Sequence, residues 1–210
     1  NKKHENVMWI NKLNLNHIEK ISAGIIFCPV ISKIKMKKNL TIVMCENPRR
    51  EFSRAHKIFN LKKDLNFLEN KKKIPKDLKM GKNVVIHGDV KIGNNVTIGD
   101  NSVIKRGSVI GNNVNIGCST TIGGSGFGYT KDEKNKYERI YHSGNVVIKD
   151  NVEIGNSTNI ERATIGSTEI GKFCKIGSLV SIAHNSKIGN NCIIATFANI
   201  GGSDKIGNNV

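Results

Sequence analysis

Aromatic residues are scarce in this sequence: Phe, Trp and Tyr make up 5% of its 210 residues, and hydrophobic residues as a whole make up 38%. This is little for a compact globule with a large core, but a repeat fold with a thin aliphatic core tolerates such a composition. No apolar run approaches the length of a membrane span, and no signal peptide is recognisable at the start. We therefore expect no transmembrane segment.

Paired cysteine motifs are also lacking. The five cysteines show no CxxC spacing and are odd in number, which argues against a zinc knuckle and against a disulfide framework. A reducing cytoplasmic location is the simplest expectation. Cys174 and Cys192 stand where a repeat described below carries Val elsewhere, so we expect them to be small core residues.

Acidic residues are few, and the formal net charge of +16 is unevenly distributed. Residues 1–82 hold 20 Lys and Arg against 7 Asp and Glu, a balance of +13, whereas residues 83–210 carry a balance of +3. A basic segment of this kind could attract nucleic acid, an acidic protein or a phosphorylated substrate, or it could reflect compositional drift alone. No nucleic-acid motif is present, and aromatic residues do not interleave with the basic ones, so we expect no nucleic-acid partner.

Isoleucine recurs every six residues over much of the chain. One series comprises Ile86, Ile92, Ile98, Ile104, Ile110, Ile116 and Ile122; a second comprises Ile148, Ile154 and Ile160; a third comprises Ile170, Ile176, Ile182, Ile188, Ile194, Ile200 and Ile206. Two residues before each Ile stands Val or a small substitute such as Ser102 or Thr120. This regularity is the signature of a repeat architecture.

A period of six fits neither an α-helix nor an ordinary hairpin strand. It predicts a coil in which three short strands form the walls of a prism, with Ile inside and Gly or Asn at corners that tolerate positive φ. The fold predicted for residues 84–210 is therefore a left-handed parallel β-helix, an exception to the usual right-handed crossover. The chain opens on Asn1 and stops partway through a repeat, so we expect further chain at both ends.

Two interruptions break the ladder. Ile122 and Ile148 are 26 residues apart, which predicts an excursion over residues 123–145, and a long loop on a regular scaffold is commonly functional. Ile160, Ile165 and Ile170 follow one another in two steps of five. The alternative for the excursion is a tolerated surface insertion.

Residues 1–73 lack the six-residue repeat and are predicted to form a small α/β domain, joined to the β-helix by a linker at 74–83. ENVMWI, SAGIIFCPV and NLTIVMCE are expected to be strands. A helix follows, with Asn47 as N-cap, Pro48 as first residue and an apolar face of Phe52, Ala55, Ile58 and Phe59.

His184, in SIAHNSKIG, is the most suggestive titratable residue of the repeats. It follows inward-facing Ile182 by two residues, so it should lie near a corner and project outward. A neutral imidazole there can take a proton from an attacking amine or hydroxyl, although many surface histidines are inert.

A series of short sequence motifs resembles the motifs of a known family. GGSGFGY (123–129), HSGNVVIKDNVEIGNSTNIERATIGSTEIG (142–171), KIGSLVSIAHNSKIG (175–189) and CENPRREFSRA (45–55) are similar, in the same order, to words of the UDP-3-O-acylglucosamine N-acyltransferase family of lipid A (lipopolysaccharide) biosynthesis, within the hexapeptide-repeat acyltransferases. The resemblance covers nearly the whole chain.

The resemblance implies an enzyme, a homotrimer in which His184 is the general base for direct acyl transfer from a thioester to the 2-amino group of a UDP-linked 3-O-acylglucosamine. The implied donor is 3-hydroxyacyl phosphopantetheine on acyl carrier protein, with no tightly bound cofactor and no metal. Implied substrate-binding residues are Phe127, Gly128, Tyr129, His142 and Asn185. VMWINKLN matches the family's nucleotide-binding word loosely, which adds Trp9, Asn11 and Lys12, although Trp9 is at least as compatible with a core position.

The sequence departs from the family at Glu161 and Ala163, which replace Asp and Gly, and it stops before a second functional histidine and the C-terminal helices. Two other readings stay open. One is an acetyl-CoA-dependent N-acetyltransferase acting on a nucleotide-linked amino sugar for surface polysaccharide. The other is a non-catalytic β-helix, either purely structural or metal-binding, although the separations of His87, His142 and His184 argue against a shared metal.

Overall fold

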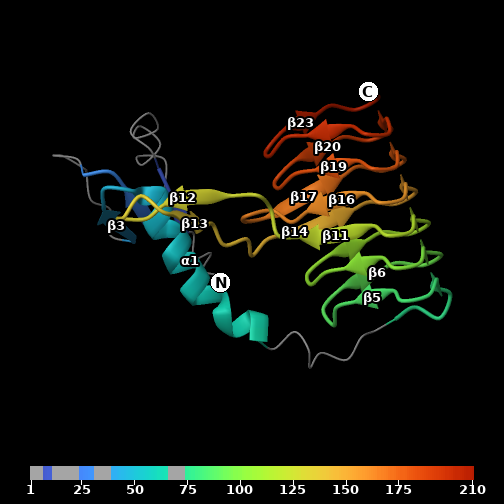
Figure 1. The fold of residues 1–210 in the computed structure, drawn as a ribbon, viewed down its shortest axis with the longest axis horizontal. Coiled ribbons are helices and arrows are strands. Elements are labelled where there is room, and N and C mark those ends of the chain that lie inside the picture. The colour runs from blue at the N-terminus through green and yellow to red at the C-terminus, as the bar shows by residue number, and fades with distance from the viewer. Residues whose placement is uncertain (1–6, 11–23, 31–38, 66–73) are drawn as a thin grey trace. The chain divides into compact units, whose positions relative to one another are not determined.

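The computed structural model describes residues 7–10, 24–30, 39–65 and 74–210. The chain divides into two compact units, residues 1–61 with 128–141 and residues 62–127 with 142–210 (Figure 1). Predicted residues Asn11 and Lys12 lie outside the described residues.

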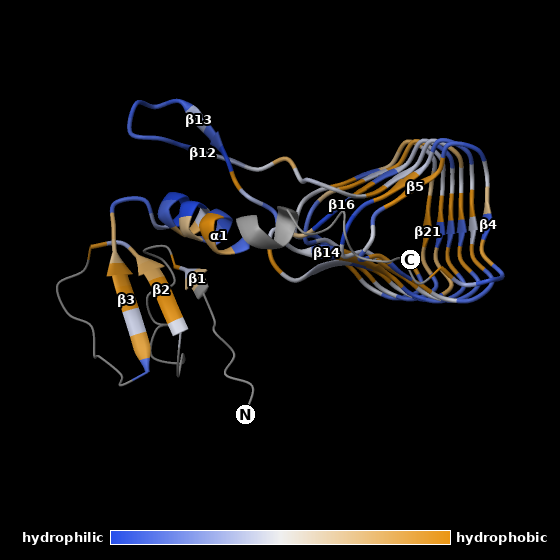
Figure 2. Ribbon diagram, turned by 90° about the horizontal axis from the view of Figure 1, so that it is seen from below, coloured by the Kyte–Doolittle hydropathy of each residue, from blue (hydrophilic) through white to orange (hydrophobic). Residues whose placement is uncertain are grey.

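The first unit contains a three-stranded parallel sheet in the order β1-β2-β3. Its strands are β1 (Val7–Trp9), β2 (Gly24–Cys28) and β3 (Leu40–Met44), which are the three segments predicted from sequence. Strands β2 and β3 are mostly hydrophobic (Figure 2), and Ile26, Cys28 and Leu40 form a small buried cluster. Because parallel strands are usually covered by helices, this sheet needs a helix against it.

Helix α1 (Pro48–Leu65) begins as predicted, because the Asn47 Oδ1 atom accepts the Arg50 backbone N–H at 3.1 Å. Phe52 is buried and its ring meets that of Phe27 edge-to-face, with centroids 6.3 Å apart. The predicted apolar face is wrong beyond this point, since Ile58 and Phe59 are both exposed.

An antiparallel hairpin of β12 (Tyr129–Lys131) and β13 (Tyr137–Arg139) completes the first unit. Arg54 of α1 pairs with two of its carboxylates, Glu133 at 2.7 Å and Glu138 at 2.8 Å. The Tyr141 backbone N–H donates to Ser53 Oγ at 3.2 Å. Residues 128–141 of the excursion are therefore part of the same unit as α1.

The second unit is a parallel β-helix with three walls of six strands each, which confirms the predicted fold (Figure 1). Wall 1 contains β4 (Lys79–Met80), β7 (Thr97–Ile98), β10 (Asn115–Ile116), β15 (Glu153–Ile154), β18 (Lys175–Ile176) and β21 (Ile193–Ile194). Wall 2 contains β5 (Val85–Ile86), β8 (Val103–Ile104), β11 (Thr121–Gly124), β16 (Asn159–Glu161), β19 (Ser181–Ile182) and β22 (Asn199–Ile200). Wall 3 contains β6 (Lys91–Ile92), β9 (Val109–Ile110), β14 (Asn145–Ile148), β17 (Ser167–Ile170), β20 (Lys187–Ile188) and β23 (Lys205–Ile206). The first strand, β4, lies within the stretch 74–83 assigned as a linker.

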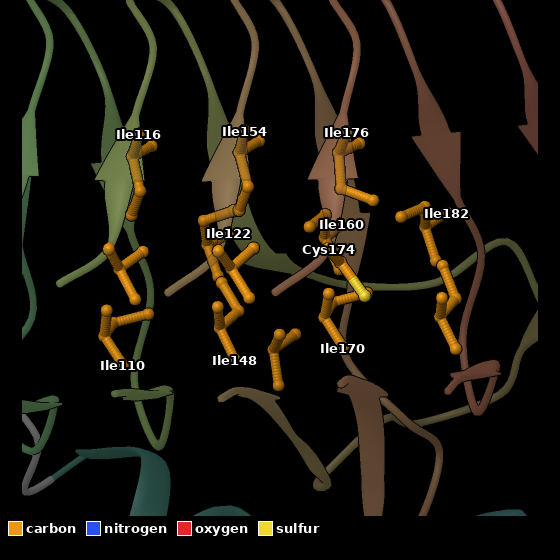
Figure 3. Packing of buried hydrophobic residues seen from close by; sticks show 14 of the residues in the cluster. Ile110, Ile116, Ile122, Ile148, Ile154, Ile160, Ile170, Cys174, Ile176 and Ile182 are labelled. Carbon is orange, nitrogen blue, oxygen red and sulfur yellow. The ribbon is translucent and has the colours of Figure 1, made fainter. Parts of the chain in front are cut away.

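Isoleucine stacks on isoleucine inside the prism (Figure 3). Ile116 is in register with Ile98 on one side and Ile154 on the other. Burying each such side chain contributes about 1.5–3 kcal/mol relative to exposure. Cys174 and Cys192 are fully buried, as predicted, and each thiol donates to a glycine carbonyl of the next coil at 3.0 Å.

A second set of small residues links successive coils through hydroxyl groups. Thr120 Oγ1 donates to the Gly155 carbonyl at 2.9 Å and accepts the Thr158 backbone N–H at 3.3 Å. Ser102 and Thr158 make the corresponding bonds in the coils on either side. These buried hydroxyls satisfy backbone groups that the turns leave outside the wall ladders.

The corners need left-handed backbone, and Asn or Ser supplies it at most of them, as at Asn95 and Asn113. Phe173, Leu179 and Phe197 are exceptions, with φ of 62°, 57° and 64°. Bulky side chains are rare in this region of φ, so these corners are locally strained.

Candidate functional site

Both interruptions of the repeat and His184 fall at one corner, where the chain passes from wall 2 to wall 3; we call it the wall 2–3 corner. In the third coil the chain leaves β11 at Gly124 and re-enters β14 at Asn145. In the fourth it runs from Glu161 to Ser167, and in the fifth this corner carries His184. Ile165, counted in the sequence as part of the ladder, is 45% exposed, so the two steps of five are one enlarged corner.

The imidazole of His184 is half-buried, and its tautomer follows from its contact with Asn185. Asn185 Nδ2 donates to the Ile165 carbonyl at 2.9 Å, and Asn185 Oδ1 accepts the Thr164 backbone N–H at 2.8 Å. The atom that lies 3.2 Å from His184 Nδ1 is therefore an oxygen. Nδ1 then carries the proton, which leaves Nε2 as the basic nitrogen.

His142 lies against His184, with ring centroids 5.2 Å apart and planes at 70°. The sequence argument that the separations of the coil-region histidines keep them apart is wrong for this pair, because the excursion returns the chain to the same corner. His142 is only 4% exposed. Among the described residues no group of three or more His, Cys, Asp or Glu is arranged to hold a metal ion.

Two glycines make room for this imidazole pair. A Cβ on Gly126 would lie 2.7 Å from His142 Nε2 and 2.8 Å from His184 Cβ. A Cβ on Gly202, in the sixth coil, would lie 2.8 Å from His184 Nε2. Contacts this short do not occur, so any larger residue at either position must displace a histidine.

Glu161 joins three successive coils at this corner. Its Oε2 atom accepts the backbone N–H of Phe127 at 3.3 Å and that of His184 at 3.2 Å. A single carboxylate oxygen thus fixes both the residue at which the excursion departs and the residue that carries the imidazole.

Arg162 braces the same corner from inside. It is buried, and its Nε and Nη2 atoms donate to the carbonyls of Gly123 and Arg106, each at 2.8 Å. A buried guanidinium is tolerated because its donors are matched with acceptors. Sequence reasoning did not identify Arg162 or Gly126 and noted Glu161 only as a departure. The signal available was a charged Glu-Arg pair directly after inward-facing Ile160.

The structure brings together four of the predicted site residues: His184, His142, Phe127 and Asn185. Phe127 is 79% exposed, and its backbone N–H shares the Glu161 acceptor with that of His184. Gly128 and Tyr129 instead belong to the hairpin of the first unit, and Trp9 ends β1 with 40% of its side chain exposed.

A separate shallow depression of about 440 Å³ lies on wall 1, beside Lys175 and Ile193. It contains none of the predicted site residues. In the part of the chain that the structure describes, no helix is long and apolar enough to cross a membrane.

Comparison with known proteins agrees with the hexapeptide-repeat β-helix. The bacterial transferase hexapeptide (six repeats) model matches residues 71–106, 89–124 and 167–202. A UDP-3-O-acylglucosamine N-acyltransferase 1 of Sulfurimonas denitrificans is 48% identical over 65 residues, which cover 31% of this chain and 20% of that protein. A relative of the same name from Legionella pneumophila (strain Paris) is 52% identical over 69 residues, which cover 33% and 19%.

The matched stretch is about a fifth of the length of these curated relatives. A solved structure of a provisionally named acetyltransferase from Bacillus cereus matches with a TM-score of 0.53 and 23% identity, over 67% of this chain and 72% of that chain. At that identity the likeness supports the fold alone. Over less than half of its length the chain thus matches the bacterial transferase hexapeptide (six repeats) model, and over about a third of its length it is similar to UDP-3-O-acylglucosamine N-acyltransferases.

Proposed function

We propose that this chain is an N-acyltransferase of lipid A synthesis. It moves an acyl group from a thioester to the 2-amino group of a UDP-linked 3-O-acylglucosamine. The observation that carries the proposal is His184: an imidazole with Nδ1 committed to Asn185 and Nε2 left basic, at the corner where the excursion leaves the repeat. The names of the relatives supply the substrate class.

The proposed reaction needs one base and no acyl-enzyme. The amine nitrogen attacks the thioester carbonyl carbon while His184 Nε2 takes the amine proton. The carbon–sulfur bond then breaks, and the proton passes from His184 to the leaving sulfur, which releases the thiol and restores the base. A positioned general base typically contributes about 10²–10⁴-fold to the rate.

We further propose that the donor is a 3-hydroxyacyl thioester on the phosphopantetheine arm of acyl carrier protein and that the enzyme works in the cytoplasm as a homotrimer. Phe127, His142 and Asn185 would line the acceptor site, and Gly128 and Tyr129 of the first unit are further proposed substrate-binding residues. Trp9 would stack on the uracil base, because it ends a parallel strand, where ligands of such sheets commonly bind. Asn11 and Lys12 would add polar contacts.

His184→Ala tests the proposal. With acyl carrier protein thioester and the UDP-linked amino sugar, turnover should fall by at least about 10²-fold, with the far-UV circular dichroism spectrum unchanged. His87→Ala, a histidine at the same corner of the first coil, is the matched control and should retain turnover. Full activity of His184→Ala would exclude it as the base.

The donor is tested separately by offering acetyl-CoA in place of the carrier thioester. Turnover with acetyl-CoA alone would contradict the lipid A assignment and favour an N-acetyltransferase. Turnover with neither donor, from protein that is correctly folded, would contradict acyl transfer itself.

A further inference from the structure

The hairpin of the first unit has two unlike faces. Alternate residues of a strand point to the same face, and the register pairs Tyr129 with Arg139 and Lys131 with Tyr137. These four residues therefore share one face, which we call the hairpin outer face. Glu138 points to the opposite face, where it pairs with Arg54 of α1.

Cations and rings alternate across the hairpin outer face. The guanidinium carbon of Arg139 lies 5.3 Å from the centroid of the Tyr129 ring, and Lys131 Nζ lies 5.9 Å from that of Tyr137. The two tyrosine rings meet edge-to-face at 6.4 Å, and Arg139 Nη2 donates to the Tyr129 hydroxyl at 3.0 Å. These contacts hold the four side chains in a fixed arrangement before any partner arrives.

The charges of the hairpin are segregated. Glu133 and Glu138 both pair with Arg54, Glu133 also pairs with Arg50, and Asp132 Oδ1 accepts the backbone N–H groups of Lys134 and Lys136 at 2.9 and 2.7 Å. The cations are all exposed: Lys131, Lys134, Lys136 and Arg139. Although its strands read as uniformly hydrophilic (Figure 2), the hairpin thus presents positive charge outward.

This arrangement corrects one expectation from the sequence. Along residues 129–141 Tyr alternates with Lys and Arg in the sequence itself, contrary to the expectation that aromatic and basic residues do not interleave. Strand pairing brings them together, because residues ten and six apart become cross-strand neighbours. The sequence argument is therefore wrong for this segment.

We propose that the hairpin outer face docks an acidic protein, the carrier that brings the acyl thioester. This inference rests on the proposed function for the identity of that carrier. Tyr and Arg are the residues that most often dominate the binding energy of protein interfaces, and Tyr137 is 77% exposed. A two-stranded ribbon offers no concavity, which small-molecule sites require. Only two cations stand on this face, whereas single-stranded nucleic acid is followed by an extended basic groove.

Charge reversal measures the docking directly. Lys131→Glu/Arg139→Glu should weaken binding of fluorescently labelled, acyl-free carrier protein by at least about tenfold in an anisotropy titration. Lys91→Glu/Lys205→Glu changes the net charge equally on exposed lysines of wall 3, so it is the matched control and should bind as the native chain does. Turnover with an acyl-pantetheine thioester, together with circular dichroism, verifies that the hairpin variant is folded.

Equal affinity of the two double variants for the carrier would overturn the proposal. So would a native chain that binds a single-stranded oligonucleotide through this face but does not bind the carrier. Carrier binding that depends on Lys131 and Arg139, in a protein that transfers no acyl group, would support the docking face and reject the proposed activity. Failure of the docking proposal and failure of the proposed acyl transfer therefore give different results.

Discussion

A side-chain carboxylate holds the backbone N–H of His184, whereas amide side chains hold those of Asn94 and Lys172. At Asn94 and Lys172 the backbone N–H donates to an Asn side chain in the following coil. His184 donates instead to Glu161, in the preceding coil. The backbone of His184 is thus hydrogen-bonded to the enlarged corner of the fourth coil, and the position of the imidazole depends on the Glu161 carboxylate.

Substitution of Glu161 tests this dependence. Glu161→Ala removes the acceptor of both the His184 and the Phe127 N–H groups, and we expect kcat to fall by about 10–100-fold, because small misplacements of reacting groups cost that much. Glu161→Gln keeps an acceptor oxygen and should retain most of the activity. Steady-state kinetics of the two variants makes the comparison. Equal losses in both would mean that the charge matters and not the hydrogen bonds.

Gly202 allows a second test of how the imidazole is held. Gly202→Ala places a methyl group within contact of His184 Nε2 and should lower kcat by at least about tenfold by displacing the ring. Gly207→Ala is the control, since a Cβ there meets nothing within 4 Å. Turnover and thermal unfolding of both variants are compared. Native turnover in Gly202→Ala would show that the ring can move without loss.

At the scale of elements, the buried hydroxyls are what join coil to coil where the Ile stacks do not reach. Thr120→Val keeps the shape of the side chain but leaves the Thr158 N–H and the Gly155 carbonyl without their partner. We expect a loss of about 1–3 kcal/mol in the free energy of unfolding, measured by urea denaturation. Thr121→Val, at the next position of the chain and only partly buried, should change stability by less than about 0.5 kcal/mol. Similar losses of stability at both positions would contradict a stabilising role for the buried hydroxyl groups.

The hairpin is attached to α1 through an ion pair that depends on pH. Hydrogen bonding to Arg54, with smaller contributions from its own backbone and nearby arginines, lowers the pKa of Glu133 from 4.5 to about 2. Because the folded-state pKa is depressed, the stabilisation is fully present above about pH 4.5 and is lost as the pH falls toward 2. The difference in urea midpoint between the native chain and Glu133→Gln should therefore shrink between pH 5 and about pH 2.5. A difference that stays constant would mean that the pair contributes nothing.

The walls could be predicted from sequence periodicity, because each short strand places one Ile inward at a regular spacing. The inward position of Ile116, for example, follows from the six-residue repeat alone, without knowledge of the residues that it contacts. The corner could not be predicted in the same way. Ile165 has a near-periodic spacing in the sequence, yet it is exposed. It lies in the enlarged corner, where its carbonyl accepts a hydrogen bond from the Asn185 amide. His142 met His184 only because an excursion of irregular length brought it back.

At the scale of the whole molecule, the net charge of +16, with +13 of it in residues 1–82, sets how an acidic partner approaches. Long-range attraction of this kind raises association rates and is screened by salt, since the Debye length falls from about 10 Å at 0.1 M to about 3 Å at 1 M. We expect kcat/KM with the carrier thioester to fall at least about tenfold over that range.

A neutral acyl-pantetheine thioester is the control for this whole-molecule effect, because it carries the same reacting group without the acidic protein. Its kcat/KM should change by less than about twofold between 0.1 and 1 M NaCl, since screening acts on charged partners. A large and equal fall for both donors would locate the salt effect at the UDP-linked acceptor or in the fold. A salt response of the carrier reaction that persists in Lys131→Glu/Arg139→Glu would assign the attraction to the basic segment as a whole. A response that disappears in that variant would confine the attraction to the hairpin outer face.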